Sequence, residues 1–220
     1  MKKLGILTIG QSPRNDVTPT FRSILGDSIK IIERGALDSL TDSEIEGIKP
    51  AEGDQTYISL LKTGKSTKIS KAKLIPLLQA ELIELEKEVD VTIILCTGDF
   101  PSIKSAKPIF YPDRVLVNVI DAVLNKGKIG LVIPLSEQKE SLLKKWSKSK
   151  CNFVTEVASP YEKSDFKQAA IHLKNQGVEA IVLDCMGYNE SHKMDVVKAS
   201  GLPTLLSRSL VARVAKEYIT

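Results

Sequence analysis

The amino-acid sequence predicts an α/β protein of two pseudo-symmetric lobes, each with a mainly parallel sheet flanked by helices. Short β-branched runs alternate with amphipathic segments along the 220 residues, as is typical of parallel strands joined by helices. The segment at 89–98 (VDVTIILCTG) recurs at 178–187 (VEAIVLDCMG), with the cysteine and the glycine in register. The opening strand at 4–7 (LGIL) recurs in type at 129–132 (IGLV). We therefore expect an N-terminal lobe at 1–125 and a C-terminal lobe at 126–220, and leave open whether the final helix packs back on the first lobe.

Strands and helices follow from local patterns. Strands are expected in short branched apolar runs at 4–9, 29–34, 91–96, 129–133, 153–158, 180–185 and 204–206. The clearest helix covers 74–89, where apolar residues recur at helical spacing: Leu74, Leu77, Leu78, Leu82, Leu85 and Val89. Further helices are expected at 16–25, 41–48, 114–126, 137–148, 165–176, 192–200 and 209–218. A capping box at Thr41 to Glu44 and glycines after three helices, Gly127, Gly177 and Gly201, support several of these ends.

One segment interrupts the alternation of strands and helices. Residues 57–61 and 66–70 flank a Lys-Thr-Gly-Lys turn and predict an antiparallel β-hairpin inserted into the first lobe near 57–70. We interpret the lysines at 62, 65, 68, 71 and 73 as a solvated hairpin edge; the alternative is a basic flap over an anionic ligand. The lysines at 139, 144, 145, 148 and 150 are interpreted as the solvent side of a helix whose apolar side carries Leu142, Leu143 and Trp146.

The composition argues against two classes of partner. Hydrophobic residues make up 42% and charged residues 26%, with a mean hydropathy of −0.04, and no uncharged apolar run approaches the ~18 residues of a membrane span. The 31 Lys and Arg residues against 27 acidic residues give a net charge of +4, well short of a nucleic-acid-binding footprint, and aromatic residues are only 5%. We therefore expect neither a membrane nor a nucleic acid as partner.

Cysteine and histidine placement gives further expectations. Cys96, Cys151 and Cys185 fit neither a disulfide framework nor a CxxC metal pattern, which indicates a reducing, cytoplasmic location. His172 and His192 have no ligand partner at metal-binding spacing, so we expect no metal. No GxGxxG or Walker A loop is present to bind a nucleotide.

Two cysteines are the candidate catalytic residues. Cys96 and Cys185 each close a predicted parallel strand, and ligands of open α/β sheets bind at such strand ends. Two facing lobes would place both thiols in one cleft, and a following helix N-terminus would lower a thiol pKa from about 8.5. A thiolate and a thiol on opposite sides of a carbon can act as base and acid. The alternative is that they pack as small hydrophobes, which we favour for Cys151 and for either cysteine alone, but not for the matched pair.

The neighbours of these cysteines and of the first strand are the candidate binding residues. The loop after the first strand could clamp a carboxylate through Gln11, Ser12 and Arg14. The matching loop of the second half carries Ser136, which is also a plausible helix N-cap, and Gln138. The residues that follow the cysteines complete the predicted site: Thr97, Gly98, Asp99, Met186, Gly187 and Tyr188. Asp184 should face away from Cys185 and needs a partner if buried; its role, structural or functional, stays open.

Three segments resemble a known family. Residues 183–188 (LDCMGY), 95–100 (LCTGDF) and 7–14 (LTIGQSPR) resemble the AroM family, and the likeness covers nearly the whole chain. That family is similar to the aspartate/glutamate/hydantoin racemase superfamily, whose members have two α/β lobes and a cleft with a cysteine from each. The resemblance implies racemisation, isomerisation or decarboxylation next to a carboxylate, without a cofactor. Those racemases follow the first cysteine with Asn-Thr and the second with Thr and a polar residue, whereas Thr97-Gly98 and Met186-Gly187 stand here, which argues against an ordinary amino acid as substrate.

The functional hypothesis combines these observations. We expect a cytoplasmic, cofactor-independent racemase- or isomerase-type enzyme that uses Cys96 and Cys185 on a small carboxylate-bearing metabolite. One alternative is an isomerase or lyase with a single nucleophilic cysteine. Another is a metabolite-binding or regulatory protein of the same fold without turnover. A homo-oligomer is left open.

Overall fold

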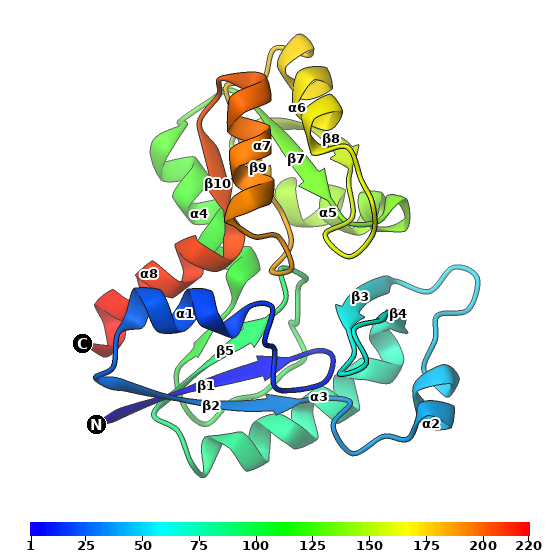
Figure 1. Ribbon diagram of the computed structural model, residues 1–220, viewed down its shortest axis with the longest axis vertical. Helices are drawn as coiled ribbons and strands as arrows, with labels where there is room; N and C mark the ends of the chain where they lie inside the picture. Colours follow the sequence, from blue (N-terminus) through cyan, green and yellow to red (C-terminus); the bar gives the residue numbers. More distant parts are fainter.

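The computed structural model describes residues 1–220 and shows two α/β lobes, one above the other in Figure 1. Each lobe contains a four-stranded sheet whose neighbouring strands are all parallel. The sheet of the first lobe has the order β2 (Ile29–Gly35), β1 (Lys2–Thr8), β5 (Val91–Leu95) and β6 (Ile109–Phe110). The sheet of the second lobe has the order β8 (Asn152–Val157), β7 (Lys128–Ile133), β9 (Ala180–Leu183) and β10 (Thr204–Leu206). The predicted fold class is confirmed.

The two sheets correspond strand by strand. β1 corresponds to β7, β2 to β8, β5 to β9 and β6 to β10, and each opening strand is a central strand of its sheet. The glycine of each opening strand lies directly under a helix: a Cβ at Gly5 would come within 2.9 Å of Leu85, and a Cβ at Gly130 within 2.9 Å of Leu173. The repeated glycine that the sequence displays is therefore a close helix-to-sheet contact made twice.

Helices surround both sheets and mostly agree with the predicted ranges. They are α1 (Thr18–Leu25), α2 (Asp42–Gly47), α3 (Lys71–Glu86), α4 (Pro112–Val123), α5 (Lys139–Trp146), α6 (Phe166–Asn175), α7 (Glu190–Ser200) and α8 (Ser207–Ile219), with a 3₁₀ turn at Ser136–Gln138 before α5. The capping box of α2 is formed by Thr41 and Glu44. Strand β6 was not predicted, because two residues are too few for a periodicity signal. No helix combines the length and the apolar character that a membrane crossing requires.

The lobes exchange a helix. Helix α4 follows the last strand of the first sheet, yet its Leu116 and Ile120 join a core cluster with Ile129 and Leu131 of the second sheet. Helix α8 follows the last strand of the second sheet but packs on the first lobe. Its apolar residues lie in a cluster that also contains Leu4 of β1. Figure 1 shows α8 beside α1 and α4 beside β10. The division of the chain at residue 125 stays a prediction.

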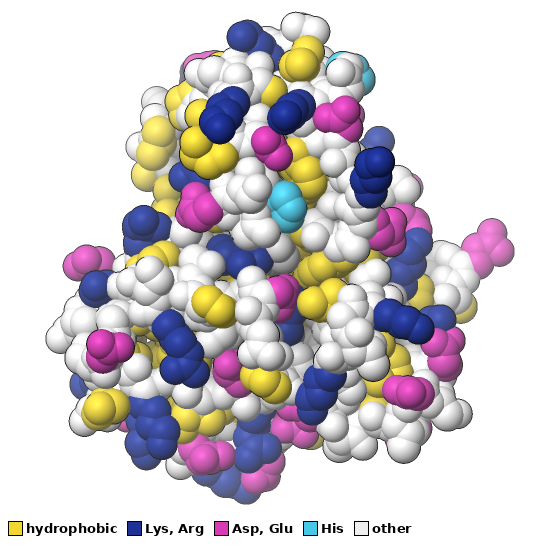
Figure 2. All heavy atoms as spheres, viewed as in Figure 1, with side chains coloured by type: hydrophobic (Ala, Val, Ile, Leu, Met, Phe, Trp, Pro, Cys, Tyr) yellow, Lys and Arg dark blue, Asp and Glu magenta, His cyan; other side chains and the backbone are white.

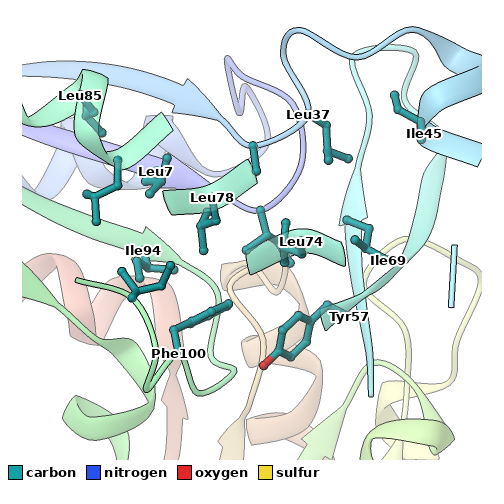
Figure 3. Close-up of a cluster of buried hydrophobic side chains, with 14 of the residues drawn as sticks. Leu7, Leu37, Ile45, Tyr57, Ile69, Leu74, Leu78, Leu85, Ile94 and Phe100 are labelled. Carbon is teal, nitrogen blue, oxygen red and sulfur yellow. The ribbon is translucent and has the colours of Figure 1, made fainter. Parts of the chain in front are cut away.

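The inserted hairpin lies between the two lobes. Strands β3 (Thr56–Leu60) and β4 (Ser66–Ser70) pair antiparallel, as predicted within one residue. Tyr57 and Ile69 anchor the hairpin in the largest apolar cluster, beside helix α3 (Figure 3). On the other side Lys68 pairs with Glu137 of the second lobe, and the Gln138 side chain donates to the Thr56 carbonyl at 3.1 Å. The hairpin therefore holds the lobes together, and its lysines are not only a solvated edge.

Candidate active site

A cavity lies where the two lobes and the hairpin meet, at the carboxyl ends of the central strands. Its solvent-accessible volume is about 40 Å³, which is space for about three water-sized groups. The first lobe contributes Arg14, Cys96, Thr97, Gly98 and Asp99; the second contributes Gln138, Lys145, Tyr161, Cys185, Met186 and Gly187; the hairpin contributes Tyr57, Ile58 and Ser59. In the view of Figure 2 the molecule narrows from the first lobe to the second, and side chains of both charges are mixed over this face.

The two cysteines lie at equivalent places in this cavity. Cys96 follows β5 and Cys185 follows β9, and both side chains line the same space. The Gly98 N–H donates to the Cys96 sulfur at 3.3 Å, and the Gly187 N–H donates to the Cys185 sulfur at 3.4 Å. An amide at this position stabilises a thiolate more than a thiol, because charge strengthens the hydrogen bond.

A tyrosine closes over each Cys-x-Gly unit. A Cβ at Gly98 would come within 2.5 Å of the Tyr57 ring, and a Cβ at Gly187 would come within 2.5 Å of the Tyr161 hydroxyl oxygen. Figure 3 shows the Tyr57 ring at the edge of its cluster, with the hydroxyl pointing away from the leucines. That hydroxyl donates to the Asp99 carbonyl at 3.1 Å, while the Tyr161 hydroxyl accepts from Arg14 at 3.2 Å. The absence of a side chain at both glycines is what lets the tyrosines pack directly against the Cys-x-Gly backbone.

The environment raises both thiol pKa values. Each cysteine keeps some accessible surface, but protein atoms surround it on most sides. This burial raises the pKa of Cys96 to about 12 and that of Cys185 to about 11, although the glycine N–H groups act in the opposite direction. The predicted lowering is wrong, because no helix begins directly behind either sulfur: α4 begins at Pro112 and α7 at Glu190.

Two guanidinium groups lie near Cys185. Arg14 binds both oxygens of Asp16, at 2.8 and 2.7 Å, and its side chain is 4% exposed. Arg208 of α8 donates to the carbonyls of Met186 and Gly187 at 3.0 and 2.6 Å, and to the Asp16 carbonyl at 2.6 Å. Arg14 is thus paired with a carboxylate and Arg208 is bound by backbone carbonyls, and the positive charge of both lowers the pKa of Cys185 against the effect of its burial.

A buried ion pair lies near Cys96. The Lys145 ammonium is 2.7 Å from both oxygens of Asp184, and the two side chains are 5% and 0% exposed. The Trp146 indole donates to the same carboxylate at 2.8 Å. Lys145 also donates to the Thr97 carbonyl at 3.1 Å, and the Thr97 hydroxyl donates to the Asp184 carbonyl at 3.0 Å. The residues next to the two cysteines are therefore tied to each other across the lobes.

The position of Lys145 shows that the interpretation of helix α5 was wrong, because this lysine was assigned to the solvent side. It lies on the inner face of α5, while Leu143, which was assigned to the apolar side, is 52% exposed. The buried Asp184 carboxylate explains this orientation, because a charge removed from water needs an opposite charge beside it. Asp184 was expected to need a partner, and the partner is a lysine of another element.

The predicted binding residues fall into two groups. Those that line the cavity are Arg14, Thr97, Gly98, Asp99, Gln138, Met186 and Gly187. Ser12 lies outside it and bonds Asp38, and Gln11 accepts from the Lys62 N–H at 2.9 Å. Ser136 is exposed beside Glu137, and Tyr188 is fully buried in the second core, donating to the Ala158 carbonyl. The lining also includes residues that were not predicted, and the polar ones among them include Tyr57, Ser59, Lys145 and Tyr161.

The comparisons with known proteins agree with this geometry. The family model described as AroM protein matches residues 4–219. The chain belongs to the AroM family. A search of curated proteins gives no match to this AroM chain.

Solved structures with the same fold include racemases and a decarboxylase. Picrophilus torridus aspartate racemase matches with a TM-score of 0.60 and 12% identity, over 100% of the AroM chain and 94% of its own chain. Unliganded arylmalonate decarboxylase matches with a TM-score of 0.62 and 11% identity, over 100% and 92%. Glutamate racemase from Campylobacter jejuni subsp. jejuni matches with a TM-score of 0.62 and 17% identity, over 98% and 85%. The AroM chain therefore has the two-lobed fold of the racemase superfamily, as the sequence resemblance implied.

Proposed function

We propose that this AroM protein is a cofactor-independent racemase- or isomerase-type enzyme that moves a proton at the α-carbon of a small carboxylate-bearing metabolite. The observation that supports this most is the pair of thiols. Cys96 and Cys185 come from equivalent strands of the two lobes, line one small cavity, and each accept a glycine N–H. The likeness to structures of aspartate and glutamate racemases supports the same chemistry.

The proposed reaction exchanges one proton for another. The thiolate of one cysteine takes the α-proton, the C–H electron pair stays on the carbon and delocalises into the carboxylate, and the opposite thiol donates its proton to the other face. One S–H bond forms while the other breaks, so no oxidant or cofactor is needed. A thiolate whose conjugate acid has a raised pKa is a strong base, as a weakly acidic C–H requires. The N–H groups of Gly98 and Gly187 and the charges of Arg14 and Lys145 would stabilise the carbanion-like transition state.

The role of Arg14 in this proposal is mainly electrostatic. Its N–H groups already donate to Asp16, Thr8, Ser59 and Tyr161. Its charge therefore acts on the cavity, but no N–H group is free to bind a substrate carboxylate. We place the reaction in the cytoplasm, where reducing conditions keep the thiols free.

The first test is exchange of the α-proton in D₂O, followed by NMR over a panel of small amino, hydroxy and malonic acids. Cys96→Ala and Cys185→Ala should each lower racemisation of an accepted substrate by a factor of about 10² or more, because each removes a proton-transfer group. Cys151→Ala is the matched control, since Cys151 lies outside the cavity and donates to the Leu124 carbonyl. Racemisation that survives in either cavity variant would contradict the two-thiol mechanism.

A second candidate is decarboxylation that uses one cysteine. The match to arylmalonate decarboxylase favours it, because that structure covers as much of this chain as the racemases do. Release of CO₂ from a malonate that depends on only one of the two cysteines would separate this reaction from racemisation.

A metabolite-binding role without turnover is favoured by the raised thiol pKa values and by Arg14, whose N–H groups all have acceptors within the protein. Thermal stabilisation by a ligand that is never converted would support that role.

A further inference from the structure

A second and larger cavity adjoins the one that holds the cysteines. Its solvent-accessible volume is about 430 Å³, against about 40 Å³ for the first. The two cavities share four lining residues: Gln55, Asp99, Ser141 and Lys145. The first cavity has room for little more than a carboxylate and the carbon beside it. A larger ligand that reaches the cysteines therefore needs adjoining space, and the second cavity offers it beside Asp99 and Lys145.

The walls of the second cavity carry cations that no carboxylate neutralises. Lys71 and Lys145 line it but are paired, with Asp99 at 2.6 Å and Asp184 at 2.7 Å. Three more cations line it without a carboxylate oxygen within 4.0 Å: Arg114 from α4, and Lys144 and Lys148 from α5 and the turn after it. The Arg114 guanidinium lies 4.1 Å from the centre of the Tyr111 ring, which holds it on this side of α4. Cations from two elements thus border one concave space.

One acidic side chain of this cavity has a carboxyl oxygen without a partner. Asp113 is 8% exposed, lines the cavity, and its Oδ1 atom has no hydrogen-bond donor. A buried polar oxygen without a partner is costly unless something else fills the place. Burial raises the pKa of Asp113, against the effect of the Lys145 charge. Asp121, by contrast, is satisfied by the Ser149 hydroxyl and the Lys150 N–H.

We propose that the second cavity is a subsite for a distal anionic group of the substrate. Arg114, Lys144 and Lys148 would hold a carboxylate or phosphate group, and Asp113 would bond a hydroxyl or amino hydrogen of the same molecule. The substrate class is then a small acid with two anionic ends, one for each cavity. The inference rests on the proposed function only in assigning the reacting end to the cysteine cavity.

The test is equilibrium binding of matched acids, measured by calorimetry on the whole chain. The pairs are 3-phosphoglycerate against glycerate and succinate against butyrate, which differ in the distal anion. We expect one doubly anionic acid to bind at least about 10-fold more tightly than its partner, and the preference to shrink with added salt. The pair that shows the larger preference identifies phosphate or carboxylate as the distal group.

Variants assign the preference to the subsite. Lys144→Ala combined with Lys148→Ala should remove it, and Asp113→Asn should weaken binding of glycerate-type acids but not of succinate, which has no hydroxyl group. Lys139→Ala is the matched control, an exposed lysine of the same helix that lines neither cavity. Equal binding within both pairs, or an equal loss in the control, would overturn the subsite.

The same measurements keep the subsite and the proposed function apart. Cys96→Ala and Cys185→Ala should retain the preference for the doubly anionic acid, because binding needs no thiol. If the preference is found but no acid exchanges its α-proton, the subsite stands and the proposed reaction falls. If an acid exchanges its α-proton but no preference is found, the proposed reaction stands and the subsite falls.

Discussion

The two halves of the site share a backbone design and differ in charge. In each half a cysteine follows a central strand, a glycine N–H reaches the sulfur, and a tyrosine lies against that glycine. Around Cys185 the Arg14 guanidinium is paired with the Asp16 carboxylate, while the Arg208 guanidinium binds backbone carbonyls. Around Cys96 the nearest cation, Lys145, is matched by Asp184. The duplicated fold therefore sets the geometry of the pair, while unrelated side chains make the two thiols chemically unequal.

The covering tyrosines show the same divergence. Tyr57 comes from the chain after β2, and Tyr161 from the chain after the corresponding strand β8. The first connection is long and forms the hairpin, whereas the second is a short loop before α6. Tyr57 is anchored in a core cluster, and Tyr161 is only partly buried. Two different connections thus deliver the same ring to equivalent places.

The largest expected effect comes from breaking the ion pair on the Cys96 side. Lys145→Met leaves the Asp184 carboxylate buried without its partner, which should lower the free energy of unfolding by about 3 to 5 kcal/mol in urea denaturation. Lys144→Met, one position along and exposed, should change it by less than about 0.5 kcal/mol.

A double variant keeps this prediction testable if the single variant does not fold. Lys145→Met with Asp184→Leu removes both charges and should recover most of the stability, because no unpaired charge remains. A loss below about 1 kcal/mol in Lys145→Met would contradict this prediction and mean that the Trp146 hydrogen bond alone is enough to stabilise the buried Asp184 carboxylate.

The glycines test whether the two halves are equally rigid. Gly98→Ala places a methyl group within 2.5 Å of the Tyr57 ring, and Gly187→Ala does the same against Tyr161. Overpacking of this kind costs about 1 to 3 kcal/mol where the neighbour cannot move. We expect that cost at Gly98, where the ring is held in a strand and a core cluster, and a smaller one at Gly187, where the ring lies on a loop.

Urea denaturation of the two alanine variants measures this difference directly. A larger loss at Gly187 than at Gly98 would reverse the assignment of the rigid half. Gly53→Ala is unsuitable as a control, since its backbone is left-handed; Gly47→Ala, with open space around its Cβ, is the better one.

The predictable part of this molecule is the part that repeats. The segments that carry Cys96 and Cys185 recur in register, so the two sheets and the shared cavity could be inferred from spacing alone. Lys145 could not, because a lysine beside two leucines on an amphipathic helix has the pattern of a solvated face, and only the carboxylate of a distant strand makes it buried. Tyr57 and Tyr161 lie in connections of different length, so no repeat links them. The exchange of α4 and α8 is likewise invisible to periodicity, which shows that a helix has an apolar face but not which sheet receives it.

The smallest and sharpest expected difference is between the two thiols themselves. Burial raises the pKa of Cys96 to about 12 and that of Cys185 to about 11, so the thiolate fraction at a given pH should be higher at Cys185. Iodoacetamide alkylation, resolved by peptide mass spectrometry between pH 7 and 10, should follow that order, with buried Cys151 the least reactive. Arg14→Gln should slow alkylation of Cys185 and leave that of Cys96 nearly unchanged, because Arg14 is the charge that most favours the Cys185 thiolate.

The same pKa values fix the sign of the alkaline stability change. Both thiols have folded pKa values above their ordinary value of 9.0, so the folded state keeps its protons longer than the unfolded chain does. The stability from burying neutral thiols is complete below about pH 9 and is lost as the pH rises toward 11 and 12. Replacing Cys96 by Ala should therefore flatten the fall over the whole of that window, and replacing Cys185 should flatten only its lower part. Equal alkylation rates together with equal alkaline profiles would show that the charges around the two cysteines do not distinguish them, and the base would then have to be assigned by the substrate alone.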